Sequence, residues 1–140
     1  LGVECVELDL SQTKLSLSLI TQLKQDLIDH RFILFRNQTL SGQLQVDISN
    51  ALGAVQSTFY KHPASPHPDI FRVSNDPSQG CQNVGRSGWH IDGTFQPRPF
   101  QYQTMYFPSV ATRGREYLFH TPQGPLRWVG VGEDDYYNRL

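Results

Sequence analysis

A histidine and an aspartate two residues apart, His90 and Asp92, are the side chains whose types and spacing suggest chemistry. On an extended strand, residues i and i+2 point to the same face, so both side chains could converge on one small ion. Imidazole nitrogen and carboxylate oxygen are two-thirds of the facial triad that binds non-haem Fe(II) and leaves positions open for oxygen and a co-substrate. The same pair could also be a surface pair or a satisfied hydrogen bond. The neighbours favour a metal site, because Gly93 lies beside the pair and the aromatic residues Trp89 and Phe95 could exclude water.

The elements that must position this pair begin with a strand, a helix and a second strand. Residues 2–10 alternate loosely between apolar and polar, which predicts the first strand. Apolar residues at helical spacing predict an amphipathic helix over residues 17–30, with Ser16 or Ser18 as its N-cap. The nearly continuous apolar run of residues 31–36 is typical of a strand that is buried on both faces.

A second helix and a loop-rich middle follow. The helix begins near Ser41 and ends at about Gly53, and its predicted apolar face consists of Leu44, Ile48, Ala51 and Leu52. Residues 57–88 are rich in proline and turn-forming residues, and only residues 69–73 within them read as a strand. Long irregular loops in compact domains tend to be lids or binding segments, so we expect this region to be functional.

The sequence of the last third of the chain predicts further strands. Residues 100–107 form a long strand with Tyr102, Thr104 and Tyr106 on one face. A turn and another strand are predicted at residues 117–119, and residues 133–140 resemble the opening of a helix. The chain therefore predicts a mixed α and β fold.

Composition limits the classes of function. At 140 residues the chain can bury a core, and its twelve basic and thirteen acidic residues are scattered. We therefore expect neither a nucleic-acid partner nor a membrane partner. Cys5 and Cys81 lie far apart and suggest reduced thiols rather than a disulfide. The sequence shows no signal peptide and no apolar run near the roughly 20 residues that span a bilayer, so we expect a cytoplasmic protein.

These motifs, in this order, resemble the N-terminal half of the taurine dioxygenase family of Fe(II)/2-oxoglutarate-dependent oxygenases. The stretches that carry the resemblance are Glu7-Leu8-Asp9-Leu10, Ile33-Leu34-Phe35-Arg36-Asn37-Gln38, Leu52-Gly53, His62-Pro63 and the Trp-His-x-Asp-x-Thr-Phe run at 89–95. The resemblance implies an α+β fold, the first half of a double-stranded β-helix (jelly roll) with flanking helices. We expect residues 1–140 to form one such partial domain.

The resemblance also implies roles for single residues. His90 and Asp92 would be iron ligands, and His62 would line the substrate pocket. Because the substrates of the family are mostly small and anionic, Arg86 would supply positive charge near the pocket, as could Lys61. Tyr117 stands where the family has a threonine that contacts 2-oxoglutarate. For His62, Arg86 and Lys61 the alternative is a simple solvated side chain.

The end of the chain departs from the family pattern. The second histidine ligand and the arginine that pairs with 2-oxoglutarate lie far downstream in relatives. The candidates in this sequence, His120, Arg127 and Arg139, all come too early. The third iron ligand and the carboxylate anchor are therefore not assigned to any residue of the chain.

Four interpretations follow. The leading one is an Fe(II)- and 2-oxoglutarate-dependent dioxygenase that uses oxygen to hydroxylate a small, anionic organic substrate and releases succinate and carbon dioxide. In this interpretation the chain could form a homo-oligomer. The alternative from another class is a truncated, non-catalytic relative that acts as a binding or regulatory partner. The remaining two are a part of a longer catalytic chain and a jelly-roll metal protein with unrelated chemistry.

Overall fold

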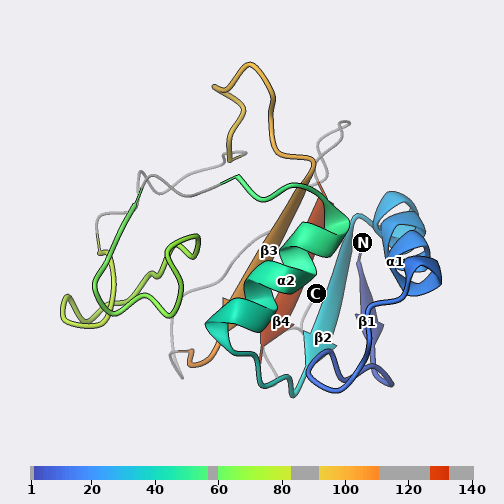
Figure 1. Cartoon of the computed structure of the whole chain (residues 1–140), viewed down its shortest axis with the longest axis horizontal. Helices are drawn as coiled ribbons and strands as arrows, with labels where there is room; N and C mark the ends of the chain where they lie inside the picture. Colours follow the sequence, from blue (N-terminus) through green and yellow to red (C-terminus); the bar gives the residue numbers. More distant parts are fainter. Residues whose placement is uncertain (1, 57–59, 83–91, 111–126, 133–140) are drawn as a thin grey trace.

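The computed structural model describes residues 2–56, 60–82 and 92–110, and the backbone of residues 127–132. The elements in chain order are β1 (Val3–Cys5), α1 (Leu17–His30), β2 (Phe32–Arg36), α2 (Gly42–Leu52), β3 (Tyr102–Phe107) and β4 (Arg127–Gly132). The strands form one sheet in the order β1-β2-β4-β3, and every neighbouring pair is parallel (Figure 1). The amino ends of the strands therefore lie at the same end of the sheet, and the segment 92–101 leads into β3 at this end (Figure 1).

Helix α1 has the predicted bounds, Leu17–His30. The Ser16 hydroxyl accepts a hydrogen bond from the amide of Leu19 at 3.2 Å, which satisfies one of the donors that a helix start leaves unpaired. Of the two predicted candidates, Ser16 is therefore the N-cap of α1. The buried residues Ile20, Leu23 and Leu27 recur at helical spacing and form the face that packs on the core.

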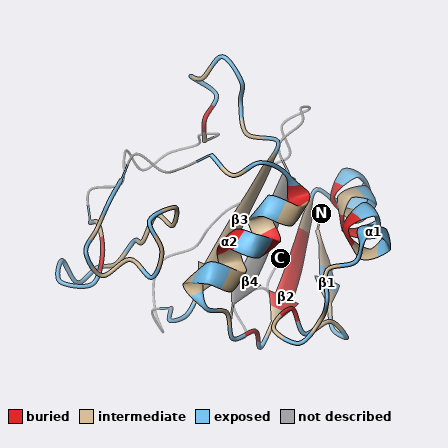
Figure 2. Cartoon of the chain, in the orientation of Figure 1, coloured by how far each residue is buried: buried red, intermediate tan, exposed pale blue. Residues whose placement is uncertain are grey.

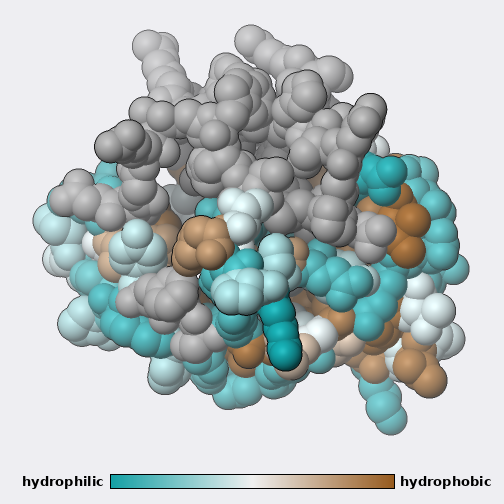
Figure 3. All heavy atoms as spheres, turned by 90° about the horizontal axis from the view of Figure 1, so that it is seen from above, coloured by the Kyte–Doolittle hydropathy of each residue, from teal (hydrophilic) through white to brown (hydrophobic). Residues whose placement is uncertain are grey.

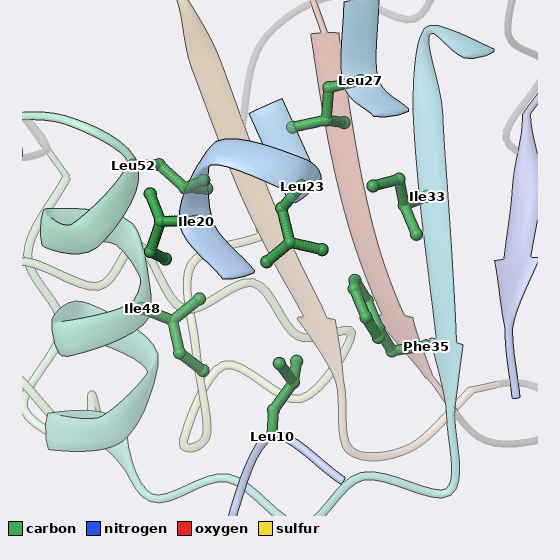
Figure 4. Close-up of a cluster of buried hydrophobic side chains, with 8 residues drawn as sticks. All are labelled: Leu10, Ile20, Leu23, Leu27, Ile33, Phe35, Ile48 and Leu52. Atoms are coloured by element: carbon green, nitrogen blue, oxygen red, sulfur yellow. The ribbon is translucent and has the colours of Figure 1, made fainter. Parts of the chain in front are cut away.

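Strand β2 is buried on both faces, as predicted. Ile33 and Phe35 share the face that packs against the helices, while Leu34 points to the opposite face and is also buried. Figure 2 shows buried residues along β2 and on the inner faces of α1 and α2. The core cluster drawn in Figure 4 consists of Leu10, Ile20, Leu23, Leu27, Ile33, Phe35, Ile48 and Leu52.

One polar side chain, Gln38, is buried next to this core, with 6% of its surface exposed. Its Oε1 accepts a hydrogen bond from the Leu10 amide at 2.7 Å, and its Nε2 donates to the carbonyls of Leu8 at 3.0 Å and Arg36 at 2.9 Å. Gln38 thereby ties the loop after β1 to the end of β2. The polar atoms of its amide are all paired, which is what burial of an amide requires.

Helix α2 begins after Ser41, whose hydroxyl caps the amide of Leu44 at 3.1 Å. Its predicted apolar face is confirmed, because Ile48 and Leu52 are buried and Leu44 and Ala51 pack against the core. The helix contacts β3 through a 2.7 Å hydrogen bond between the hydroxyls of Ser49 and Thr104.

The predicted face of β3 is also confirmed, although the strand is shorter than the predicted 100–107. Tyr102 and Tyr106 pack against the core cluster, and Thr104, between them, bonds to α2. The intervening Gln103 therefore lies on the sheet face opposite the helices.

Two strand predictions are corrected. The first strand covers Val3–Cys5 rather than residues 2–10, because Asp9 folds the chain back into a turn in which its carbonyl accepts from the amides of Gln12 and Thr13. Residues 69–73 form no strand, and Val73 makes only an isolated bridge to Cys81. The elements predicted at 117–119 and 133–140 lie outside the described residues. The double-stranded β-helix with flanking helices stays a prediction.

The cysteines and the helices bear on the predicted reduced thiols and on the predicted absence of a membrane partner. Cys5 and Cys81 are both free cysteines. None of the helices in the described part of the chain is long and apolar enough to cross a membrane.

Candidate functional site

Asp92 lies at the start of a turn rather than on a strand. Residues 92–95 turn, and the amide of Gln96 donates to the carbonyl of Gly93 at 3.0 Å. The idea that His90 and Asp92 share a strand face therefore does not describe Asp92, whose side chain is half-buried. His90 lies outside the described residues, as does Trp89.

Gly93 is required by this turn for two reasons. Its φ is +74°, in the left-handed region that side chains disfavour. A Cβ at this position would also lie 2.7 Å from Cδ2 of Phe100, well inside van der Waals contact. The absence of a side chain therefore lets the Asp92 turn lie directly on the Phe100 ring, which is one of the anchors of Asp92.

The second anchor is Gln103, on β3. Its Nε2 donates to Oδ2 of Asp92 at 2.8 Å. An exchange of the amide nitrogen and oxygen would place two acceptors against each other, so the chemistry fixes the orientation of this amide. The Oε1 atom of Gln103 is then left buried without a hydrogen-bond partner among the described residues.

Sequence reasoning missed Gln103. A signal was available, because Gln103 is a polar residue in the middle of an aromatic strand and alternates with the core-facing residues Tyr102 and Thr104. A polar side chain on the other face of such a strand indicates a polar neighbour there. Only the fold shows that this neighbour is Asp92, eleven positions earlier.

The expected role of Phe95 in excluding water is corrected. Its side chain, at the last residue of the 92–95 turn, is 78% exposed. Figure 3 shows the surface from above, where hydrophilic residues predominate on the described part and apolar areas are small.

His62 lies in a proline turn of the segment 60–82, which Figure 1 shows beside the sheet. Its carbonyl accepts from the amide of Ser65 at 2.9 Å, and its Nδ1 accepts from the amide of Ala64 at 3.1 Å. Because Nδ1 accepts, the ring proton of the neutral imidazole is on Nε2, which lies 3.0 Å from the carbonyl of Pro77 and donates to it. Both ring nitrogens of His62 therefore bond to the backbone of its own segment.

Lys61 donates to the carbonyl of Pro68 within the same segment. Neighbouring turns repeat the construction of His62. Nδ1 of His67 accepts from the Asp69 amide at 3.1 Å, and Oδ1 of Asp76 accepts from the Ser78 amide at 2.8 Å. A proline follows His62, His67 and Asp76 in each case, and proline favours such turns because its φ is already set. The segment is thus built from rigid turns rather than from the predicted strand.

Of the two predicted iron ligands, Asp92 is described and His90 is not. Within the ranges that the structure describes, no group of three or more His, Cys, Asp or Glu side chains is placed to hold a metal ion. His90, Arg86, Tyr117 and His120 lie outside those ranges, so the predicted site residues with a described side chain are Asp92, His62 and Lys61. A half-buried carboxylate that is oriented by an amide donor is nevertheless the kind of ligand that an Fe(II) site needs.

Comparison with known proteins identifies the family of the chain. The sequence model described as "Taurine catabolism dioxygenase TauD, TfdA family" matches residues 1–119, a range that contains both His90 and Asp92. The chain therefore belongs to this family of Fe(II)/2-oxoglutarate dioxygenases, as the motifs indicated. No solved structure matches the chain.

Proposed function

We propose that this chain carries the first part of the active site of an Fe(II)- and 2-oxoglutarate-dependent dioxygenase that hydroxylates a small, anionic organic substrate. The observation that carries the proposal is the family match over residues 1–119, within which the Asp92 carboxylate is held by Gln103. The fold around the site would be the first half of a double-stranded β-helix.

His90 and Asp92 would hold the iron. When bound, the iron and 2-oxoglutarate supply the activation of oxygen and the decarboxylation that yields succinate. The protein orients the ligands, and Gln103 and the Gly93–Phe100 contact keep the Asp92 carboxylate in place. Tyr117 would donate a hydrogen bond to 2-oxoglutarate, because a tyrosine hydroxyl can donate to a carboxylate.

The substrate would be recognised by its negative charge. Arg86 would contribute a cationic side chain, and Nε2–H of His62 would exchange the Pro77 carbonyl for an oxygen of the substrate. Sulfonates, sulfate esters and carboxylates are the small anions that family membership suggests as substrates.

The proposal is tested by an anaerobic titration of the chain with Fe(II) and 2-oxoglutarate, followed by the visible charge-transfer band of the chelate. We expect a band in the wild-type chain that is lost in Asp92→Ala, because this substitution removes a ligand oxygen. Asp47→Ala is the matched control, since Asp47 is an exposed aspartate on α2 and should leave the band unchanged.

Two outcomes contradict the proposal. A band of equal intensity in Asp92→Ala would show that the chelate forms elsewhere. A folded wild-type chain without any band would mean that residues 1–140 do not form the chelate by themselves, as expected of a part of a longer catalytic chain or of a non-catalytic relative that acts as a binding or regulatory partner. Circular dichroism of each variant separates loss of the site from loss of the fold.

A further inference from the structure

The bond between Gln103 and Asp92 joins a loop to a rigid element. Gln103 lies in β3, where its register is fixed opposite Trp128 of β4. Asp92 lies in a turn that precedes the strand by several residues. Side chains on strands are held more precisely than side chains on loops, so the bond transfers the precision of the sheet to the Asp92 carboxylate.

The buried Oε1 atom of Gln103 shows which bond determines the position of this amide. A buried carbonyl oxygen without a partner costs about 1–3 kcal/mol. Gln103 keeps that arrangement, with Oε1 unpartnered among the described residues, while its Nε2 donates to Asp92. A side chain selected only for packing in the aromatic strand would be apolar. The contact with the Asp92 carboxylate explains why an amide side chain occupies this position.

We propose that Gln103 is a positioning residue for a metal ion bound by Asp92. The proposal rests on the proposed function and adds to it a residue outside the ligand set. A carboxylate has about four lone-pair sites, so the bond from Gln103 to Oδ2 does not by itself prevent a metal from binding to the same carboxylate. The amide restricts the rotation of the carboxylate, and the metal then meets an oxygen that is already oriented.

Removal of such a hydrogen bond from a ligating side chain typically lowers metal affinity by about 10–100-fold. The test uses Co(II) as the probe, because its ligand-field absorption reports both the affinity and the geometry of the site. Gln103→Met keeps the length of the side chain and removes the donor. We expect it to lower Co(II) affinity by about 10–100-fold and to change the ligand-field spectrum at saturation.

Gln101→Met is the matched control. Gln101 is an exposed glutamine two positions earlier in the same segment, and its replacement should leave both affinity and spectrum unchanged. Gln103→Asn is the second variant, because it retains the amide but is one methylene shorter and cannot reach Asp92 from the same backbone position. It should lose affinity as Gln103→Met does.

The outcomes separate this proposal from the proposed function. If the wild-type chain binds Co(II) through Asp92 and Gln103→Met gives the same affinity and spectrum, Gln103 has no positioning role while the function stands. If the folded wild-type chain binds no Co(II), or Asp92→Ala binds it equally well, the proposed function fails and this proposal fails with it.

Discussion

Two glutamines of this chain, Gln38 after the end of β2 and Gln103 within β3, are bonded differently. Gln38 is almost fully buried and uses its amide oxygen and nitrogen to bond three backbone groups. Gln103 gives one bond to the Asp92 carboxylate, and its amide oxygen has no partner among the described residues. In Gln38 the amide oxygen and the amide nitrogen are both hydrogen-bonded. In Gln103 only the amide nitrogen is hydrogen-bonded within the described residues.

The difference separates a region whose bonds serve the stability of the fold from the region that we propose to bind a metal. Around Gln38, two capped helices and a strand buried on both faces form a core whose polar groups are paired. Around Gln103, a turn that needs a glycine packs on the Phe100 ring and accepts a hydrogen bond from the Gln103 amide. Functional sites commonly retain such unsatisfied groups, because a ligand and not the fold completes them.

The largest effect on stability is expected from Gln38→Met, which tests whether the bonds of Gln38 stabilise the fold. This variant leaves the buried Leu10 amide and the part-buried carbonyls of Leu8 and Arg36 without this partner, and a buried orphan costs about 1–3 kcal/mol. We expect the free energy of unfolding to fall by about 3 kcal/mol, measured by urea denaturation.

Gln25→Met is the control for this prediction. Gln25 is exposed on α1, where it donates to Asp29 at 3.0 Å, and its replacement should change stability by no more than about 0.5 kcal/mol. Equal effects of the two substitutions would show that the Gln38 bonds contribute nothing net, and the contrast with Gln103 would lose its basis.

The second prediction concerns the stability of Gln103→Met. The variant loses the bond to Asp92 but also removes the buried oxygen that has no partner among the described residues, and the two effects oppose each other. We expect the free energy of unfolding to change by less than about 1 kcal/mol, in the same urea experiment. A loss as large as that of Gln38→Met would mean that Gln103 serves the fold in the same way as Gln38.

The sequence predicts the stable region far better than the site. The bounds of α1, the burial of β2 and the faces of α2 and β3 follow from apolar periodicity and capping serines, because each depends on neighbours within a few residues. The family motif contains Gln38, but nothing local shows that it bonds Leu8 and Leu10, some thirty positions earlier.

The Asp92 environment depends on pairings that no local pattern encodes. A His-x-Asp spacing suggests a shared strand face, yet Asp92 lies in a turn, since Gly93 has a positive φ and packs against Phe100. Similarly, residues 69–73 have the composition of a strand, but the surrounding proline turns give them no strand to pair with beyond one bridge. Both errors come from tertiary context that overrides local propensity.

The smallest expected effect concerns two aspartate turns, one next to the core and one in the segment 60–82. Asp9 and Asp76 each accept bonds from the amide and hydroxyl of the serine two positions later, Ser11 and Ser78. The serine hydroxyl, and after it the serine amide, lower the pKa of each aspartate below its ordinary value. Both aspartates thus favour folding in their ionised form.

A carboxyl whose pKa is lowered in the folded state contributes stability above the unfolded pKa, about 3.9 for aspartate, and loses it as the pH falls through the folded pKa. Asp9→Asn and Asp76→Asn should therefore each destabilise the chain slightly at pH 7. The difference from wild type should shrink below about pH 4, as followed by urea denaturation across pH.

The two variants should still differ from each other at pH 7. The Asp9 turn positions Leu10, which is 2% exposed and bonded to Gln38, so a loosened turn there weakens the core. The Asp76 turn borders Gly80 and the isolated bridge of Cys81, which lie outside the core cluster. We expect the larger loss in global stability from Asp9→Asn. A larger loss from Asp76→Asn would mean that the proline-turn segment 60–82 folds cooperatively with the core, and the separation of this segment from the core would then be wrong.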